Sequence, residues 1–180
     1  MMTSGGKIMV RILLVEPVAS LREAIRRVLS ESGEFEIVGE LPGARDAISA
    51  CELLQPSMIL MDVESRDGIS GIDMAKVLHE RFPAVSIVLC ALSPEITYSE
   101  RSKALGAKGY FNLSCDLSEI LAYLQAISRG DSVFIPSKKF PAPVGLAEFT
   151  SREKEILRHI CRGETTDTTA RELFISENTE

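Results

Sequence analysis

The sequence predicts an α/β fold in which five parallel strands form one sheet with helices on both faces. Apolar runs of strand length alternate with helical apolar patterns through residues 9–130. The run at residues 58–61 is apolar without a break, which is typical of a strand buried on both faces. Alternation of this kind requires parallel strands joined by right-handed crossovers, so we expect a doubly wound sheet.

The first half of the sheet is expected between residues 9 and 62. A capping-box pattern from Ser20 to Glu23 is expected to start the first helix, and Gly33 to end it. Pro56 separates the second helix from the strand that ends with Asp62. In order, the expected elements are a strand at 9–15, a helix at 20–32, a strand at 35–38, a helix at 44–54 and a strand at 57–62.

The second half repeats the alternation. Asp116 and Glu119 form another capping box at the start of the last helix, and Gly130 is expected to end that helix. In order, the expected elements are a helix at 72–82, a strand at 85–91, a helix at 94–105, a strand within 106–111 and the last helix.

This order of elements is typical of flavodoxin-like sheets, whose strands lie in the order 2-1-3-4-5. The first and third strands are then neighbours, and each ends in a carboxylate, Glu16 and Asp62. Cys90 and Leu113 end the fourth and fifth strands, so all four residues are expected around one shallow cleft. Asp62 also fits a simpler role, in which it ends the strand and accepts hydrogen bonds from the following turn.

Composition and charge argue against several classes of protein. The net charge of −6 gives no general surface for polyanions, so any contact with nucleic acid has to be local. The cysteines and histidines show no metal-ligand spacing, which favours reduced thiols. Residues 1–8 are expected to be a disordered tail, no apolar stretch can span a membrane, and a cytoplasmic protein is expected. No glycine-rich phosphate loop follows the first strand, which argues against a dinucleotide enzyme.

A second, smaller unit is expected after a linker. Residues 131–148 contain three prolines and no helical periodicity, which indicates a linker. A further capping box, from Thr150 to Glu153, then starts an amphipathic helix. Residues 149–180 are therefore expected to be a partial helical domain.

The two regions resemble the two parts of a NarL-type response regulator. Residues 9–130 resemble a CheY-like receiver domain through the strand–helix order, the strand-ending Asp62 and the motif Gly106-Ala107-Lys108-Gly109-Tyr110. Residues 149–180 resemble the start of a LuxR-type helix-turn-helix. That second resemblance is carried by the capping box with Glu155, Ile156 and Leu157, by Gly163, and by Ala170, Leu173, Phe174, Ile175, Ser176 and Thr179.

The resemblance implies a phosphorylation site at the carboxyl edge of the sheet. Asp62 matches the aspartate that accepts the phosphoryl group. Glu16, Asp62 and Glu64 match the positions that bind Mg²⁺ in the family. Pro17 stands where the family has its second acidic residue, so one side-chain ligand for Mg²⁺ is missing.

Three further positions match the family's switch residues. Cys90 replaces a Ser or Thr, Leu113 replaces a Lys, and Tyr110 matches the switch aromatic. Cys90 is expected to be a buried, unreactive thiol rather than a redox sensor. Tyr110 is either a ring that moves between inside and outside or an ordinary half-buried strand tyrosine.

These replacements predict a degenerate receiver that does not depend on phosphorylation. Loss of the hydroxyl and the ammonium group removes on the order of 3–5 kcal/mol of interaction with a phosphoryl group. About 5.5 kcal/mol is needed to drive a two-state switch from one state to the other. A phosphoryl group on Asp62 would therefore move the switch poorly.

The resemblance places the DNA-reading helix at the end of the sequence. That helix would begin at Ser176, with Ser176 and Thr179 toward DNA, but only four residues follow Ser176. Residues 148–180 hold five Lys or Arg against eight Asp or Glu, a net charge of −3 that repels phosphates. Little specific DNA binding is expected from these 180 residues, whether the chain is a truncated form or has lost its reading helix.

Two functions are compatible with these features. The first is a DNA-binding transcription regulator of a two-component system, with DNA, a sensor histidine kinase and a second copy of the chain as partners. The alternative is a pseudo-receiver that acts only as a protein-interaction or dimerisation module without DNA binding. An enzyme is not favoured, because no nucleophile–base pair or cofactor loop can be placed.

Overall fold

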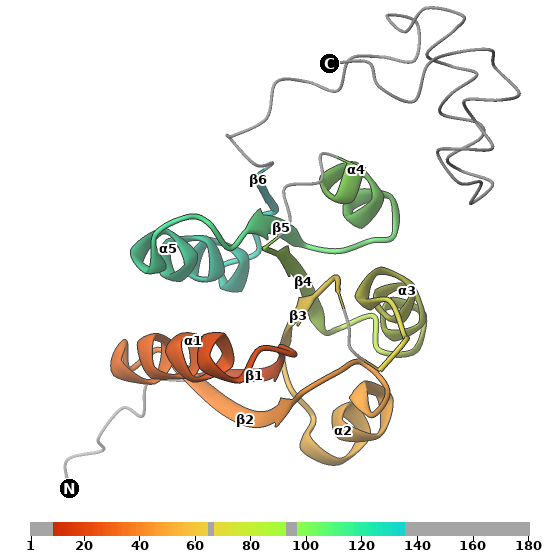
Figure 1. Ribbon diagram of the computed structural model, residues 1–180, viewed down its shortest axis with the longest axis horizontal. Helices are drawn as coiled ribbons and strands as arrows, with labels where there is room; N and C mark the ends of the chain where they lie inside the picture. Colours follow the sequence, from red (N-terminus) through yellow and green to blue (C-terminus); the bar gives the residue numbers. More distant parts are fainter. Residues whose placement is uncertain (1–8, 65–66, 93–96, 136–180) are drawn as a thin grey trace, which may run out of the picture. The chain divides into compact units, whose positions relative to one another are not determined.

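The computed structural model describes residues 9–64, 67–92 and 97–135, which form one sheet with helices on both faces (Figure 1). The sheet has six parallel strands in the order β2-β1-β3-β4-β5-β6. The strands are β1 (Val10–Val15), β2 (Phe35–Leu41), β3 (Met58–Asp62), β4 (Ser86–Ala91), β5 (Gly109–Asn112) and β6 (Val133–Ile135). The predicted doubly wound fold and the order 2-1-3-4-5 of the first five strands are confirmed.

Five helices within these ranges cover the sheet, α1 and α5 on one face and α2, α3 and α4 on the other (Figure 1). They are α1 (Ala19–Glu31), α2 (Ala47–Leu54), α3 (Gly71–Arg81), α4 (Thr97–Ala104) and α5 (Leu117–Ser128). Each face has its own apolar cluster, and every residue of β3 is buried, as predicted for the central strand. Not one of these five helices is long and apolar enough to cross a membrane.

A sixth strand lies in the segment that the sequence indicates as a linker, so the prediction of five strands is one too few. β6 pairs with β5, and Phe134 lies opposite Tyr110. Its side chains alternate between the two apolar clusters, but three residues are too few for this alternation to be read from the sequence. The rest of the predicted linker, the predicted tail 1–8 and the predicted domain at 149–180 lie outside the described residues.

The start of α1 differs from the predicted capping box. The helix begins at Ala19, its N-cap residue Val18 has no side-chain cap, and Ser20 therefore lies inside the first turn. Glu23 pairs with Arg26 instead of reaching back to the N-terminus. The capping box at Asp116 and Glu119 is confirmed at the start of α5.

Gly71 lets α3 begin directly against the end of β3. A Cβ atom at this position would lie 2.0 Å from the backbone oxygen of Asp62, far inside van der Waals contact. The Gly71 N–H donates to the carbonyl oxygen of Val63 at 3.0 Å, which holds the two segments together. Any side chain here would push the end of β3 and the start of α3 apart.

We predict that Gly71→Ala lowers the free energy of unfolding by about 2–3 kcal/mol, because the added methyl meets backbone that cannot move aside. The three tyrosines all lie between residues 98 and 123 and the chain has no tryptophan, so tyrosine fluorescence in a urea titration follows this domain alone. Ser70→Ala is the control, because Ser70 caps α3 without a side-chain hydrogen bond. Equal stability of the two variants would contradict the close contact.

Candidate functional site

Two carboxyl groups meet at the carboxyl edge of the sheet. Glu16 follows β1 and Asp62 ends the neighbouring strand β3, and their side chains hydrogen-bond each other. Glu16 is 1% exposed and Asp62 is 6% exposed, so both are withdrawn from water. The predicted convergence of these two residues is confirmed.

Backbone groups hold the two carboxyl groups in place. The N–H of Val18 donates to Oε1 of Glu16 at 2.7 Å, and the N–H of Glu64 donates to Oδ1 of Asp62 at 2.6 Å. Arg22 of α1 donates to the backbone oxygen of Glu16 and lies 3.5 Å from a carboxylate oxygen of Glu40 on β2. The loop after β1 is thereby fixed to α1 and to β2.

The surroundings of the pair favour a shared proton over two charges. Burial, together with the neighbouring charges of Glu16 and Glu64, raises the pKa of Asp62 to about 7 against the opposing hydrogen bond from the Glu64 N–H. Two carboxylates in contact cannot both ionise at low cost when each is buried. Below about pH 7 the pair therefore holds a proton between Glu16 and Asp62.

Cys90 lies beside Asp62 in the neighbouring strand β4, as predicted. It is 1% exposed, and burial together with the charges of Asp62 and Glu16 raises its pKa well above the ordinary value for a thiol. The thiol stays protonated and is a weak hydrogen-bond donor. This burial matches the expected unreactive cysteine.

Leu113 and Tyr110 extend the site along β5. The Leu113 N–H donates to the carbonyl oxygen of Ala91 at 2.8 Å, and its half-buried side chain packs against the apolar cluster under α1 and α5. Tyr110 is fully buried, with its ring edge-on to Tyr98 of α4. The interpretation of Tyr110 as a half-buried strand residue is therefore wrong.

The residues at this edge do not make a complete magnesium site. Mg²⁺ demands six oxygen ligands in near-octahedral geometry, and receiver domains typically bind it at this acidic edge. Here Pro17 supplies no side-chain oxygen, the Glu64 side chain is exposed, and backbone N–H groups occupy one oxygen of Glu16 and one of Asp62. No cluster of three His, Cys, Asp or Glu side chains suited to a metal occurs among residues 9–64, 67–92 and 97–135. The donor set therefore does not fit Mg²⁺.

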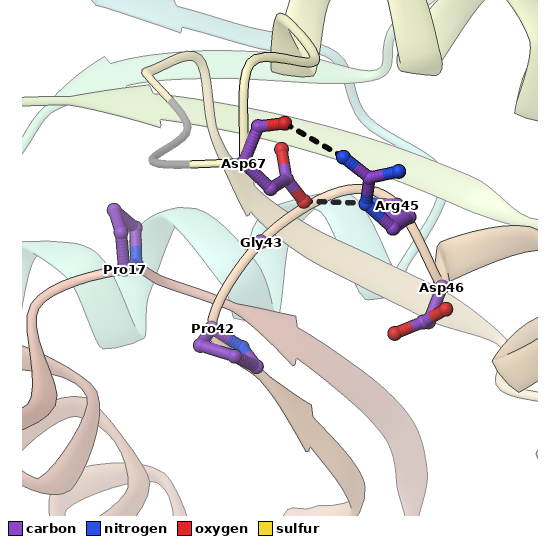
Figure 2. Close-up of a pocket in the computed structure, with 6 residues that line it drawn as sticks. All are labelled: Pro17, Pro42, Gly43, Arg45, Asp46 and Asp67. Atoms are coloured by element: carbon purple, nitrogen blue, oxygen red, sulfur yellow. Dashed lines mark hydrogen bonds between the residues drawn. The ribbon is translucent and has the colours of Figure 1, made fainter.

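A link between two loops beside this pair was not predicted. Asp67 accepts the N–H of Arg45 on Oδ2 at 2.9 Å, and its backbone oxygen accepts the Arg45 guanidinium at 3.0 Å (Figure 2). The loop between β3 and α3 is thus tied to the loop between β2 and α2. The link forms one wall of a cavity of about 400 Å³, lined by Pro17, Pro42, Gly43, Arg45, Asp46 and Asp67.

Asn112 is a second unpredicted contributor. It is buried at the end of β5, its amide donates to the Leu92 carbonyl at 3.4 Å, and its oxygen accepts the Ser114 N–H at 2.9 Å. One side chain therefore touches both the loop after β4 and the loop after β5. The predicted DNA-facing residues Ser176 and Thr179 lie outside the described part of the chain.

The sequence and the fold were compared with known proteins. Residues 12–125 match the family model described as "Response regulator receiver domain", and residues 147–179 match "Bacterial regulatory proteins, luxR family". The uncharacterized transcriptional regulatory protein YxjL of Bacillus subtilis is 30% identical over 183 residues, covering 94% of this chain and 84% of YxjL.

Two solved structures share the fold. A LuxR-family two-component response regulator from Aurantimonas sp. is 24% identical with a TM-score of 0.66, covering 70% of this chain and 89% of that chain. The RcsB response regulator of Salmonella typhimurium is 17% identical with a TM-score of 0.67, covering 94% and 85%. The receiver match alone spans more than half of the sequence and includes Glu16, Asp62 and Cys90. The chain therefore belongs to the LuxR/NarL family of response regulators, which join a receiver domain to a LuxR-type DNA-binding domain.

Proposed function

We propose that this response regulator controls transcription through its LuxR-type domain without phosphorylation of Asp62. The observation that carries the proposal is the buried Glu16–Asp62 pair, which shares a proton beside Cys90 rather than beside a hydroxyl group. Leu113 stands at the end of β5 in place of an ammonium group. The role in transcription is supported by the luxR-family match and by the name of YxjL.

The chemistry of acyl phosphate formation is disfavoured at Asp62. The carboxylate must be ionised to attack phosphorus, whereas burial and the charge of Glu16 favour the protonated form. Within the described ranges, the side-chain charges that act on Asp62 are those of Glu16 and Glu64, both negative. A phosphoryl group would add further negative charge, and like charges about 4 Å apart repel by roughly 4 kcal/mol at an effective dielectric constant near 20.

The partners in this proposal follow from the LuxR-type domain. DNA is bound by the complete output domain, and RcsB, which shares the fold, has been solved in complex with DNA. Two RcsB dimers have also been solved bound to DNA, which supports a second copy of the chain as a partner. A sensor histidine kinase would act by binding to the receiver, without phosphoryl transfer, in the cytoplasm.

The first prediction concerns the modification itself. Incubation of the full chain with Mg²⁺ and acetyl phosphate at pH 6.5 is expected to leave Asp62 unmodified, because the site favours the protonated carboxyl group and Leu113 supplies no ammonium group to the incoming phosphoryl group. Intact-mass spectrometry after a short acid quench measures the result. Stoichiometric addition of one phosphoryl group would overturn the proposal.

A variant that restores the missing groups is the matched control. The triple variant Pro17→Asp, Cys90→Thr and Leu113→Lys supplies a second carboxylate, a hydroxyl and an ammonium group at the three degenerate positions. It is expected to gain Mg²⁺-dependent acyl phosphate under the same conditions. Adding Asp62→Asn to the triple variant is expected to abolish that gain.

The shared proton also links stability to pH. The pKa of Asp62 is about 7 in the folded chain and near 3.8 without the fold, so between these values the folded state binds more protons. Stability from this group is complete below about pH 4 and is lost as the pH rises through 7. One pKa unit corresponds to about 1.4 kcal/mol, so the whole effect is on the order of 4 kcal/mol.

The second prediction follows from this linkage. Asp62→Asn replaces the shared proton by an amide N–H, so the variant is expected to be more stable than the wild type by about 2–3 kcal/mol at pH 8 and by little at pH 4.5. Urea titrations followed by tyrosine fluorescence measure the difference at each pH. Asp131 is an exposed aspartate after α5, and Asp131→Asn is expected to change stability by the same amount at both pH values. If the stability difference between Asp62→Asn and the wild type were also independent of pH, Glu16 and Asp62 would not share a proton.

A further inference from the structure

Three aromatic residues, one each on α4, β5 and β6, belong to the same apolar cluster on one face of the sheet. Tyr110 of β5 is fully buried, and its ring lies edge-on to Tyr98 of α4, with 6.4 Å between centroids and 63° between planes. Phe134 of β6 lies opposite Tyr110 in the parallel register, and both outer residues pack against the cluster that contains Tyr110. We call Tyr98, Tyr110 and Phe134 the aromatic row.

Small residues lie where β5 meets β6 and on the buried side of α4. A Cβ atom at Gly109 would lie 2.9 Å from the Val133 carbonyl oxygen and 2.6 Å from Cδ1 of Ile127, so glycine lets β6 and α5 pack against β5. On α4, Ser102 is fully buried and donates its hydroxyl hydrogen to the Tyr98 carbonyl at 2.6 Å. The buried face of α4 therefore includes a short side chain whose hydroxyl group is satisfied within the helix.

β6 ends at the point where the chain leaves the described receiver. Because β6 is parallel to β5, its last residue Ile135 lies opposite Phe111, toward the carboxyl edge. The luxR-family match begins twelve residues later in the sequence, at residue 147. The position of β6 therefore sets where the connection to the DNA-binding domain starts.

We propose that the aromatic row couples α4 to β6, so that β6 is the strand by which the receiver passes a displacement of α4 to the chain that follows. Packed side chains move together, because a shift of one ring leaves a void or an overlap beside the next. The proposal goes beyond phosphorylation independence, since any partner that binds α4 would engage the same row. Removal of the Phe134 ring would remove side-chain packing between β6 and this cluster, while the backbone pairing of β5 with β6 would remain.

The test uses the full chain labelled with 3-fluorotyrosine, which gives three ¹⁹F signals for the three tyrosines. Tyr98→Phe, Tyr110→Phe and Tyr123→Phe assign them. Phe134→Ala is expected to shift or broaden the Tyr110 signal and to speed amide hydrogen exchange in α4 and β6 at least tenfold. Phe134→Leu keeps most of the apolar volume, so this variant is expected to remain folded and to show the same changes with smaller magnitude.

Val133→Ala is the matched control, because it removes apolar volume from the same strand on the opposite face. It is expected to loosen β6 while leaving the Tyr110 signal in place and exchange in α4 within threefold of wild type. Unchanged Tyr110 and α4 in both Phe134 variants, or equal effects of Val133→Ala, would overturn the coupling.

One further arm separates this inference from the proposed function. Mg²⁺ with beryllofluoride is added to the wild-type chain, and the Tyr110 signal is expected not to move. A shift there would contradict phosphorylation independence, whereas the comparison of Phe134 with Val133 variants would still decide whether the aromatic row couples α4 to β6.

Discussion

The contact between the carboxyl groups of Glu16 and Asp62 is the constraint on which the site depends. Two buried acids in contact need one proton between them, and the fold supplies no opposite charge within the described part of the chain to replace that proton. When the two carboxyl groups share a proton, their hydrogen bond joins the ends of β1 and β3. The apolar and thiol side chains of Leu113 and Cys90 lie beside the pair, which carries one negative charge instead of two once the proton is shared.

Much of this arrangement could be predicted because it follows from periodicity and topology. The apolar run of β3 identifies a central strand, and the alternation of elements fixes which strand ends are neighbours. Glu16 and Asp62 are therefore brought together by the order of the strands, without any knowledge of side-chain packing. The capping box of α5 is a local pattern and was equally readable from Asp116 and Glu119.

The remaining features depend on contacts between residues distant in sequence. The link from Arg45 to Asp67 joins positions 22 residues apart, and no local pattern identifies one as the partner of the other. At α1 the local pattern is misleading. The N–H of Val18 donates to the Glu16 side chain, and the helix begins at Ala19, so Ser20 lies inside the helix and cannot be its N-cap. Asn112 resembles an ordinary turn residue until its burial between two loops is seen.

The short sixth strand has a consequence for the behaviour of the chain at high concentration. An uncovered β5 would offer its backbone groups to any other extended chain. β6 occupies them with only three residues, and so short a strand leaves few backbone groups for a further chain to pair with. At the opposite border, β2 carries Glu36 and Glu40, which pair with Arg11 and Arg22, and charged side chains on an edge strand discourage a second strand from adding there. Both borders of the sheet are thus protected against intermolecular strand addition, the usual first step toward aggregation.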